Sequence, residues 1–179
     1  HLRTLKQARL VEGRREGKYR IYRLSGDDVA GLWVALRKVA EQHLLELRQA
    51  LAGMLGEPNA LESVGQRTLL NRARRGEVVV IDVRPEAEFR QAHLPYARSV
   101  PLTELSRRLR ELPRDKEIVA YCRGPFCLMS DEAVALLRRR GYRARQLREG
   151  VSEWQAAGFP LRRSHAVRPA DRPAMRETP

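Results

Sequence analysis

The chain has 179 residues, of which 42% are hydrophobic and 32% charged, and its formal net charge is +13. This composition excludes an intrinsically disordered chain, and the absence of any run of about 18 apolar residues excludes a membrane-spanning one. We therefore expect a cytoplasmic protein of one or two modest domains, with no membrane partner. Because Leu2 and Leu5 already follow a helical spacing directly after His1, we also expect the sequence to come from a longer protein.

Positive charge is concentrated at the two ends of the chain. Residues 1–23 carry eight Lys or Arg against two Glu, and the segment after Leu161 adds five Arg against Asp171 and Glu177. Dense cationic stretches of this kind suit phosphate backbones. The alternative is a general preference for Arg, since only four of the 35 basic residues are Lys.

The first region, residues 1–52, combines the end of a helix, a hairpin and a long helix. The spacing of the leucines up to Leu10 predicts the end of an amphipathic helix. Glu16-Gly17 predicts a two-residue hairpin turn, in which the glycine adopts positive φ. Asp27 is the expected N-cap of a helix over 28–51. Its apolar positions cover more than one face, so we expect part of it to pack on a partner helix in a homodimer.

The stretch "HLRTLKQARLVEGRREGKYRIYRLS" resembles the end of the recognition helix and the wing of ArsR-type winged helix-turn-helix repressors. The resemblance covers residues 1–52, and the first helices of that family are absent. It implies a DNA partner for the full-length protein, with wing cations on phosphates and helix side chains on base edges. The residues expected to contact DNA are His1, Arg3, Thr4, Gln7, Arg14, Arg15, Lys18 and Arg20.

The remaining chain divides into a linker at 53–59, a domain at 60–163 and a basic, disordered tail at 164–179. Continuous apolar runs at 78–83 and 117–121 are typical of strands covered on both faces. Helical patterns occur at 64–74, 103–111 and 130–140, and a shorter helix follows Gly150, with Trp154 as its apolar anchor. This alternation predicts an α/β domain with a parallel sheet.

Both cysteines lie in the segment "YCRGPFCLMS". Cys122 follows the strand 117–121 and precedes a helix, at the sheet edge where α/β proteins bind ligands. Backbone N–H groups of the loop and the charge of Arg123 would stabilise a thiolate there, although a merely packed cysteine is the alternative. A structural disulfide is unusual in the cytoplasm, and the cysteine spacing with no nearby His does not suit zinc. We therefore expect neither a metal nor a cofactor.

The third region resembles a rhodanese domain. The resemblance rests on "VVVIDVRPEAEFRQAHLPYARSVPLTEL", on "IVAYCRG" and on "GVSEW". It implies that Cys122 accepts a sulfane sulfur and carries it as a persulfide. Side chains of the first motif are expected to fix loops rather than to catalyse, namely Asp82, Arg84, Glu88 and His93.

The cysteine loop departs from that family. Cys127 replaces a second basic residue, and Pro125 removes one N–H donor. A cysteine phosphatase would require Arg at the position of Leu128. Cys127 either resolves an oxidised or persulfidated Cys122 as a disulfide or is simply a packed side chain, and the sequence leaves both open.

Together these patterns predict a transcriptional repressor that senses sulfane sulfur or oxidants through Cys122, Arg123 and Cys127. The alternative is a sulfurtransferase that acts through a Cys122 persulfide and carries an appended winged module. A third possibility is an inert rhodanese fold that serves only as an interaction platform.

Overall fold

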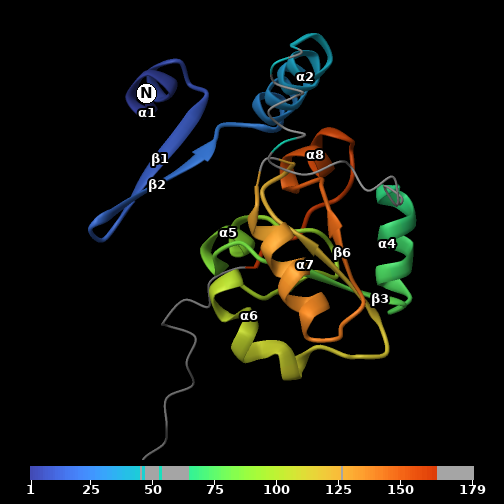
Figure 1. Cartoon of the computed structure of the whole chain (residues 1–179). Coiled ribbons are helices and arrows are strands. Elements are labelled where there is room, and N and C mark those ends of the chain that lie inside the picture. Colours follow the sequence, from blue (N-terminus) through green and yellow to red (C-terminus); the bar gives the residue numbers. More distant parts are fainter. Residues whose placement is uncertain (45, 47–52, 54–64, 126, 165–179) are drawn as a thin grey trace, which may run out of the picture.

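The computed structural model describes residues 1–44, 46, 53, 65–125 and 127–164, and it arranges them as two parts (Figure 1). We call residues 1–44 the N-terminal module and residues 65–164 the α/β domain. Apart from Gly53, the predicted linker lies outside the described residues, as does the predicted tail from residue 165. The predicted domain boundaries therefore stay predictions.

The N-terminal module consists of a short helix, an antiparallel hairpin and a longer helix. In chain order these are α1 (Leu2–Gln7), β1 (Val11–Glu16), β2 (Tyr19–Leu24) and α2 (Asp27–His43). Arg9 has a φ of 57° and ends the helical path, so Leu10 does not extend α1. Val11 opens β1 and is buried, whereas Leu2 and Leu5 remain exposed.

The hairpin turn lies one residue later than predicted. Glu16 pairs with Tyr19, so the two central residues are Gly17 and Lys18. Gly17 has a φ of 60°, as expected of the glycine. A turn with positive φ at its first central position matches the right-handed twist of the two strands, which explains the shift.

Helix α2 differs from its prediction at both ends. Gly26, not Asp27, is the N-cap. Asp27 is the first helical residue, and its carboxylate interacts favourably with the positive end of the helix dipole. The helix ends at His43 and Leu44 is extended, so the predicted helix over 28–51 is wrong as one continuous helix. Helices are held mainly by packing, and no described side chain beyond Arg37 in α2 is buried.

The α/β domain is built on a four-stranded parallel sheet of order β4-β3-β5-β6 (Figure 1). The strands are β3 (Val78–Asp82), β4 (Arg98–Ser99), β5 (Glu117–Tyr121) and β6 (Ala144–Leu147). The helices are α4 (Gln66–Arg74), α5 (Glu86–Gln91), α6 (Leu102–Arg108), the 3-10 turn η1 (Leu109–Glu111), α7 (Met129–Arg139) and α8 (Val151–Ala156).

Two apolar cores lie on opposite faces of this sheet. One joins β3 and β5 to α6, η1 and α7, and the other joins the same strands to α4 and α8. Every residue of β3 is buried, which is why both central strands read as continuous apolar runs. The predicted parallel α/β domain is thus confirmed, while β4, β6 and α5 were not predicted.

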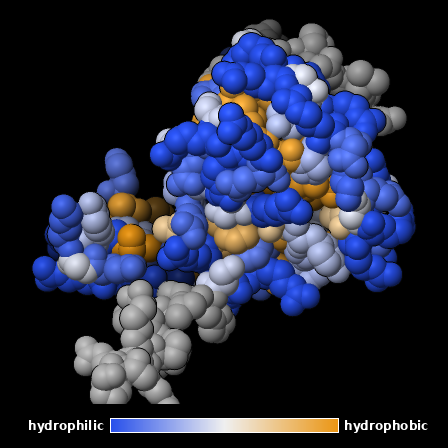
Figure 2. Space-filling model, turned by 90° about the horizontal axis from the view of Figure 1, so that it is seen from below, coloured by the Kyte–Doolittle hydropathy of each residue, from blue (hydrophilic) through white to orange (hydrophobic). Residues whose placement is uncertain are grey.

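Seen from below, the N-terminal module projects to one side of the α/β domain (Figure 2). Its visible surface is mostly hydrophilic, with a small apolar patch. Among the helices that the structure describes, none combines enough length with enough apolar character to cross a membrane.

Candidate functional site

The cysteine loop, residues 122–128, connects the carboxyl end of β5 to the start of α7. Cys122 follows β5 directly and is 1% exposed, while Cys127 is partly buried against the core under α7. Gly124 has a φ of 135°, a conformation that favours glycine, and its carbonyl accepts the Cys127 N–H at 3.1 Å. The loop therefore bends back on itself and brings its two ends together.

The two cysteines form a disulfide, with their Cα atoms 6.2 Å apart. The loop thus brings the two cysteines within bonding range, as expected, while Cys127 also packs against the core, and its role in the chemistry stays a prediction. The disulfide closes a short loop at the carboxyl ends of the parallel strands.

Arg123 extends away from the disulfide towards helix α5. Its Nε and Nη2 atoms donate to the Glu88 carboxylate at 3.0 Å and 2.5 Å, and hydrogen bonding to Glu88 raises the pKa of the guanidinium. The side chain is 52% exposed. Its positive charge is therefore paired with a carboxylate, and Glu88 takes part in the site although we expected it only to fix a loop.

Polar side chains hold the far end of the loop at the start of α7. The Ser130 hydroxyl donates to the Cys127 carbonyl at 3.4 Å and accepts from the Gln146 amide at 2.9 Å. The same amide donates to Asp131 at 3.0 Å. Burial raises the pKa of the Asp131 carboxyl above its ordinary value. Gln146 thus ties Cys127 to strand β6, a contact that sequence reasoning missed because β6 itself was missed.

Three residues of the first motif fix loops, as predicted. The Arg84 guanidinium pairs with buried Asp82 at 2.6 Å and donates to the Ala92 carbonyl at 2.8 Å. His93 stacks on Phe89, with ring centroids 3.7 Å apart, and its Nδ1 lies 2.8 Å from the Phe89 carbonyl. These contacts are local and none of them reaches the disulfide.

Tyr121 anchors the end of β5 immediately before Cys122. It is fully buried, and its hydroxyl accepts the Leu94 N–H at 3.1 Å. Burial, with the nearby charge of Asp82, raises the pKa of this phenol well above its ordinary value. The side chain therefore stays protonated and fixes the backbone from which the cysteine loop departs.

Two charged residues that the sequence did not single out lie beneath the loop. Glu153 of α8 packs against Gly124, and Arg37 of α2 pairs with Glu153 at 3.2 Å. Both side chains are 8% exposed. The available signal was positional: Arg37 follows Ala30 and Val34 at helical spacing, so it shares their buried face.

The residues predicted to contact DNA lie on the N-terminal module, and all of them are exposed. Arg15 and Arg20 are cross-strand partners and share one face of the hairpin, while Arg14 lies on the other face and pairs with Glu16 at 3.2 Å. Lys18 is at the turn. The structure therefore spreads the wing cations over both faces instead of gathering them on one.

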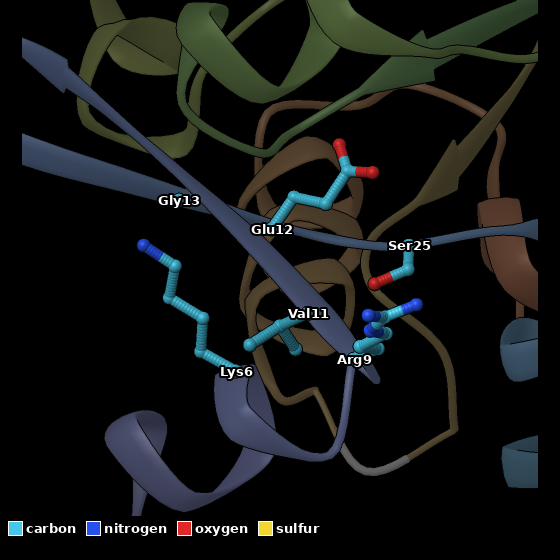
Figure 3. Close-up of a pocket in the computed structure, with 6 residues that line it drawn as sticks. All are labelled: Lys6, Arg9, Val11, Glu12, Gly13 and Ser25. Carbon is cyan, nitrogen blue, oxygen red and sulfur yellow. The ribbon is translucent and has the colours of Figure 1, made fainter.

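A hollow lies between α1 and the base of the hairpin (Figure 3). Lys6 and Arg9 extend on opposite sides of Val11, and the Glu12 carboxylate is turned away from both. Glu12 instead pairs with Arg23 at 2.6 Å. The residues that line the hollow all belong to the N-terminal module, so it adds cationic surface to that module.

The parallel sheet, with a cysteine at the carboxyl end of β5 and a loop leading into a helix, defines a rhodanese-like domain. The Rhodanese-like domain family matches residues 66–157, which is about half of the chain, and the chain belongs to this family. The BH2092 protein of Bacillus halodurans has a similar fold, with a TM-score of 0.51 and 26% identity over 55% of this chain and 74% of that one.

Two relatives carry names of different functional classes. The chain is 42% identical over 161 residues to the HTH-type transcriptional regulator Rv0324 of Mycobacterium tuberculosis, a match that covers 90% of this chain and 70% of the relative. It is 35% identical over 101 residues to a sulfurtransferase of Allochromatium vinosum, covering 56% of this chain and 89% of the relative. The first match extends beyond the rhodanese-like domain into the N-terminal module, because it spans most of the chain.

Proposed function

We propose that the chain belongs to a transcriptional repressor whose rhodanese-like domain senses sulfane sulfur or an oxidant through Cys122 and Cys127. The observation that carries the proposal is the disulfide between them, at the sheet edge where a rhodanese-like domain holds its reactive cysteine. A sensor needs two interconvertible states, and a dithiol and a disulfide in one loop provide them. The resemblance of 161 residues of the chain to an HTH-type transcriptional regulator supports the link to DNA.

The chemistry requires only the two thiols and a polysulfide, which supplies the sulfur and accepts the electrons. The Cys122 thiolate attacks the sulfane sulfur of a polysulfide and becomes a persulfide, and the donor leaves one sulfur shorter. The Cys127 thiolate then attacks Sγ of Cys122, forms the disulfide and expels hydrosulfide. The two thiols are oxidised by two electrons, and the transferred sulfur is reduced to hydrosulfide.

In this proposal the N-terminal module is the end of a winged helix-turn-helix unit of ArsR type, acting in the cytoplasm. Arg14, Arg15, Lys18 and Arg20 of the wing would contact phosphates. His1, Arg3, Thr4 and Gln7 would face base edges from α1. Support comes from the exposure of all these side chains and from the lack of any carboxylate contact at Arg15 and Arg20 within the described residues.

The proposal also includes a homodimer formed through α2. Leu32, Trp33, Leu36 and Val39 are each more than half exposed, and three of them recur at helical spacing on one face. An apolar stripe of this length on a helix is typical of a protein interface. Light scattering should report a dimer for the parent protein, and Leu36→Glu should shift it to a monomer; a monomeric parent would contradict this part.

The test of the sensor uses the full-length protein and its operator. We expect polysulfide to release the parent protein from DNA and Cys122→Ser to stay bound. Cys127→Ser should respond only if the persulfide alone suffices. Fluorescence anisotropy with labelled operator measures the occupancy. Release of Cys122→Ser by polysulfide to the same extent as the parent would place sensing elsewhere.

The second candidate is a sulfurtransferase, favoured by the relative with that name. Multiple turnovers of thiosulfate with a thiol acceptor would distinguish it from a sensor, which reacts once per protein. Against it stand the pairing of Arg123 with Glu88 and the cysteine in place of a second cation, since both leave less positive charge for a dianionic donor.

A further inference from the structure

Helix α2 packs on helix α8 (Figure 1), so the N-terminal module touches the rhodanese-like domain at the helix whose Glu153 lies against Gly124 of the cysteine loop. The buried face of α2 consists of Ala30, Val34 and Arg37. At its first turn, Asp27 accepts a hydrogen bond from the Gln155 amide of α8. The face that carries Leu36 points away from this contact and remains exposed.

The centre of the contact is an ion pair between buried groups. Arg37 Nη1 lies 3.2 Å from Glu153 Oε1, and both side chains are 8% exposed. Because each charge has lost most of its water, each is stabilised by the opposite charge of the other. A displacement of α2 that separates them would remove this stabilisation, so the pair favours one docked position.

Glu153 also contacts the cysteine loop. Its Oε2 accepts the Gly150 N–H at 2.8 Å, and both carboxylate oxygens would lie 3.1 Å from a Cβ placed on Gly124. A Cβ on Gly150 would lie 2.5 Å from the carbonyl carbon and oxygen of Arg123. Backbone at 123–124 therefore packs without free space on the start of α8, and it cannot shift towards α8 unless Glu153 or Gly150 moves.

The disulfide constrains the same backbone. Gly124 lies between Cys122 and Cys127, and its carbonyl accepts the Cys127 N–H at 3.1 Å. Opening the disulfide frees this bend to relax, and relaxation at Gly124 acts on the Glu153 carboxylate that holds Arg37. On the other side, β2 ends at Leu24 and α2 begins at Asp27, so a displacement of α2 is passed to the basic hairpin through two residues.

We propose that the Arg37–Glu153 ion pair couples the bond state of Cys122 and Cys127 to the docking of α2 on the rhodanese-like domain. Its consequence for DNA rests on the function proposed above. Arg37 and Glu153 are positioning residues, since neither takes part in sulfur chemistry. The coupling is an equilibrium property, so a ligand of the N-terminal module must also shift the disulfide's reduction equilibrium by the same factor.

The test compares the full-length parent with the double variant Arg37→Met and Glu153→Gln. This variant removes both charges of the pair together, and the introduced amide retains a side-chain oxygen for the Gly150 N–H, so it is expected to fold. Glu86→Gln is the matched control, because it removes an exposed ion pair with Arg90 in the same domain. Each protein is studied as the disulfide and after reduction with dithiothreitol. Dithiothreitol is oxidised to its cyclic disulfide while the protein disulfide becomes two cysteine thiols.

Two measurements separate the coupling from the regulator function. Hydrogen exchange of the α2 amides should differ between the two redox states in the parent and the control, and the double variant should lose this difference. The ratio of operator affinities should be about tenfold in the parent and within about twofold in the double variant. A response of α2 without any change in DNA affinity would support the coupling and refute the regulator. Unchanged α2 exchange in the parent, or a double variant that responds like the parent, would overturn the coupling.

Discussion

The α/β domain and the N-terminal module each contain an element rich in apolar residues, and these two elements differ in burial. Strand β3 and helix α2 are both rich in branched apolar residues, yet every residue of β3 is buried while Leu32, Leu36 and Val39 of α2 are exposed. A sheet covered on both faces encloses its own core, whereas a two-stranded hairpin has little to enclose. The α/β domain is therefore expected to be stable by itself, and the module to depend on what its helix docks against.

The largest expected effect is a truncation in the sheet. Ile81 is 0% exposed, so Ile81→Ala should lower the free energy of unfolding by about 2–5 kcal/mol through lost contacts and a cavity. Leu2→Ala in the N-terminal module, where the side chain is 47% exposed, should change it by less than ~0.5 kcal/mol. Urea unfolding followed by circular dichroism measures both. Equal losses would mean that the module has a core of its own.

Loss of the disulfide should rank next. The bond joins residues with a sequence separation of 5, and closing so short a loop is worth about 2 kcal/mol in the chain-entropy model. The oxidised parent should therefore be more stable than the reduced parent by about this amount. Cys127→Ser should match the reduced parent and be insensitive to dithiothreitol. A reduced parent as stable as the oxidised one would show that the loop is held by its packing alone.

Two glycine substitutions test the packing between the loop and α8. Gly150→Ala places a Cβ 2.5 Å from the Arg123 backbone and should cost roughly 1–3 kcal/mol. Gly31→Ala in α2 meets nothing within 4 Å and should stabilise the protein by about 0.5–1 kcal/mol, because alanine is the better helix former. Thermal unfolding gives the sign of each change, and a neutral Gly150→Ala would refute the close approach.

The smallest effect on stability is expected on the hairpin. Arg15 and Arg20 are directly opposite each other, so Arg20→Ala should leave stability unchanged or raise it by a few tenths of a kcal/mol. In the full-length protein the same change should reduce the slope of DNA affinity against salt concentration by about 1. Arg23→Ala, which loses the Glu12 ion pair on the other face, is the control. An unaltered salt slope in Arg20→Ala would remove this residue from the DNA interface.

The pattern of residues along the chain predicted the class of the α/β domain and the place of its cysteine. Strand 117–121 was predicted with the bounds of β5, and the helices at 64–74 and 130–140 correspond to α4 and α7 within two residues at each end. One or both faces of each of these elements are buried, so each shows a regular apolar pattern in the sequence. The position of Cys122 was predicted in the same way, because this residue comes directly after β5.

Elements that lie at the sheet edge could not be recognised in this manner. Strand β6 contains Arg145 and Gln146, which are satisfied by partners distant in sequence: Arg145 binds Glu117 at 2.5 Å and Gln146 binds Ser130 at 2.9 Å. Strand β4 has only two residues. Neither produces an apolar alternation, so both become visible only when neighbouring strands supply their partners.

The sequence by itself determined the rhodanese-like class, the position of Cys122 at the end of a strand and the cationic nature of the first 23 residues, because each depends on neighbours along the chain. Only the tertiary structure decided which face of α2 is buried. Apolar residues recur on more than one face of α2, and the α8 surface takes the face with Ala30, Val34 and Arg37. The reason is that Glu153, which is distant in sequence, is buried next to the cysteine loop, where a cation stabilises its charge. The periodicity of residues within α2 cannot reveal a charge that lies so far along the chain.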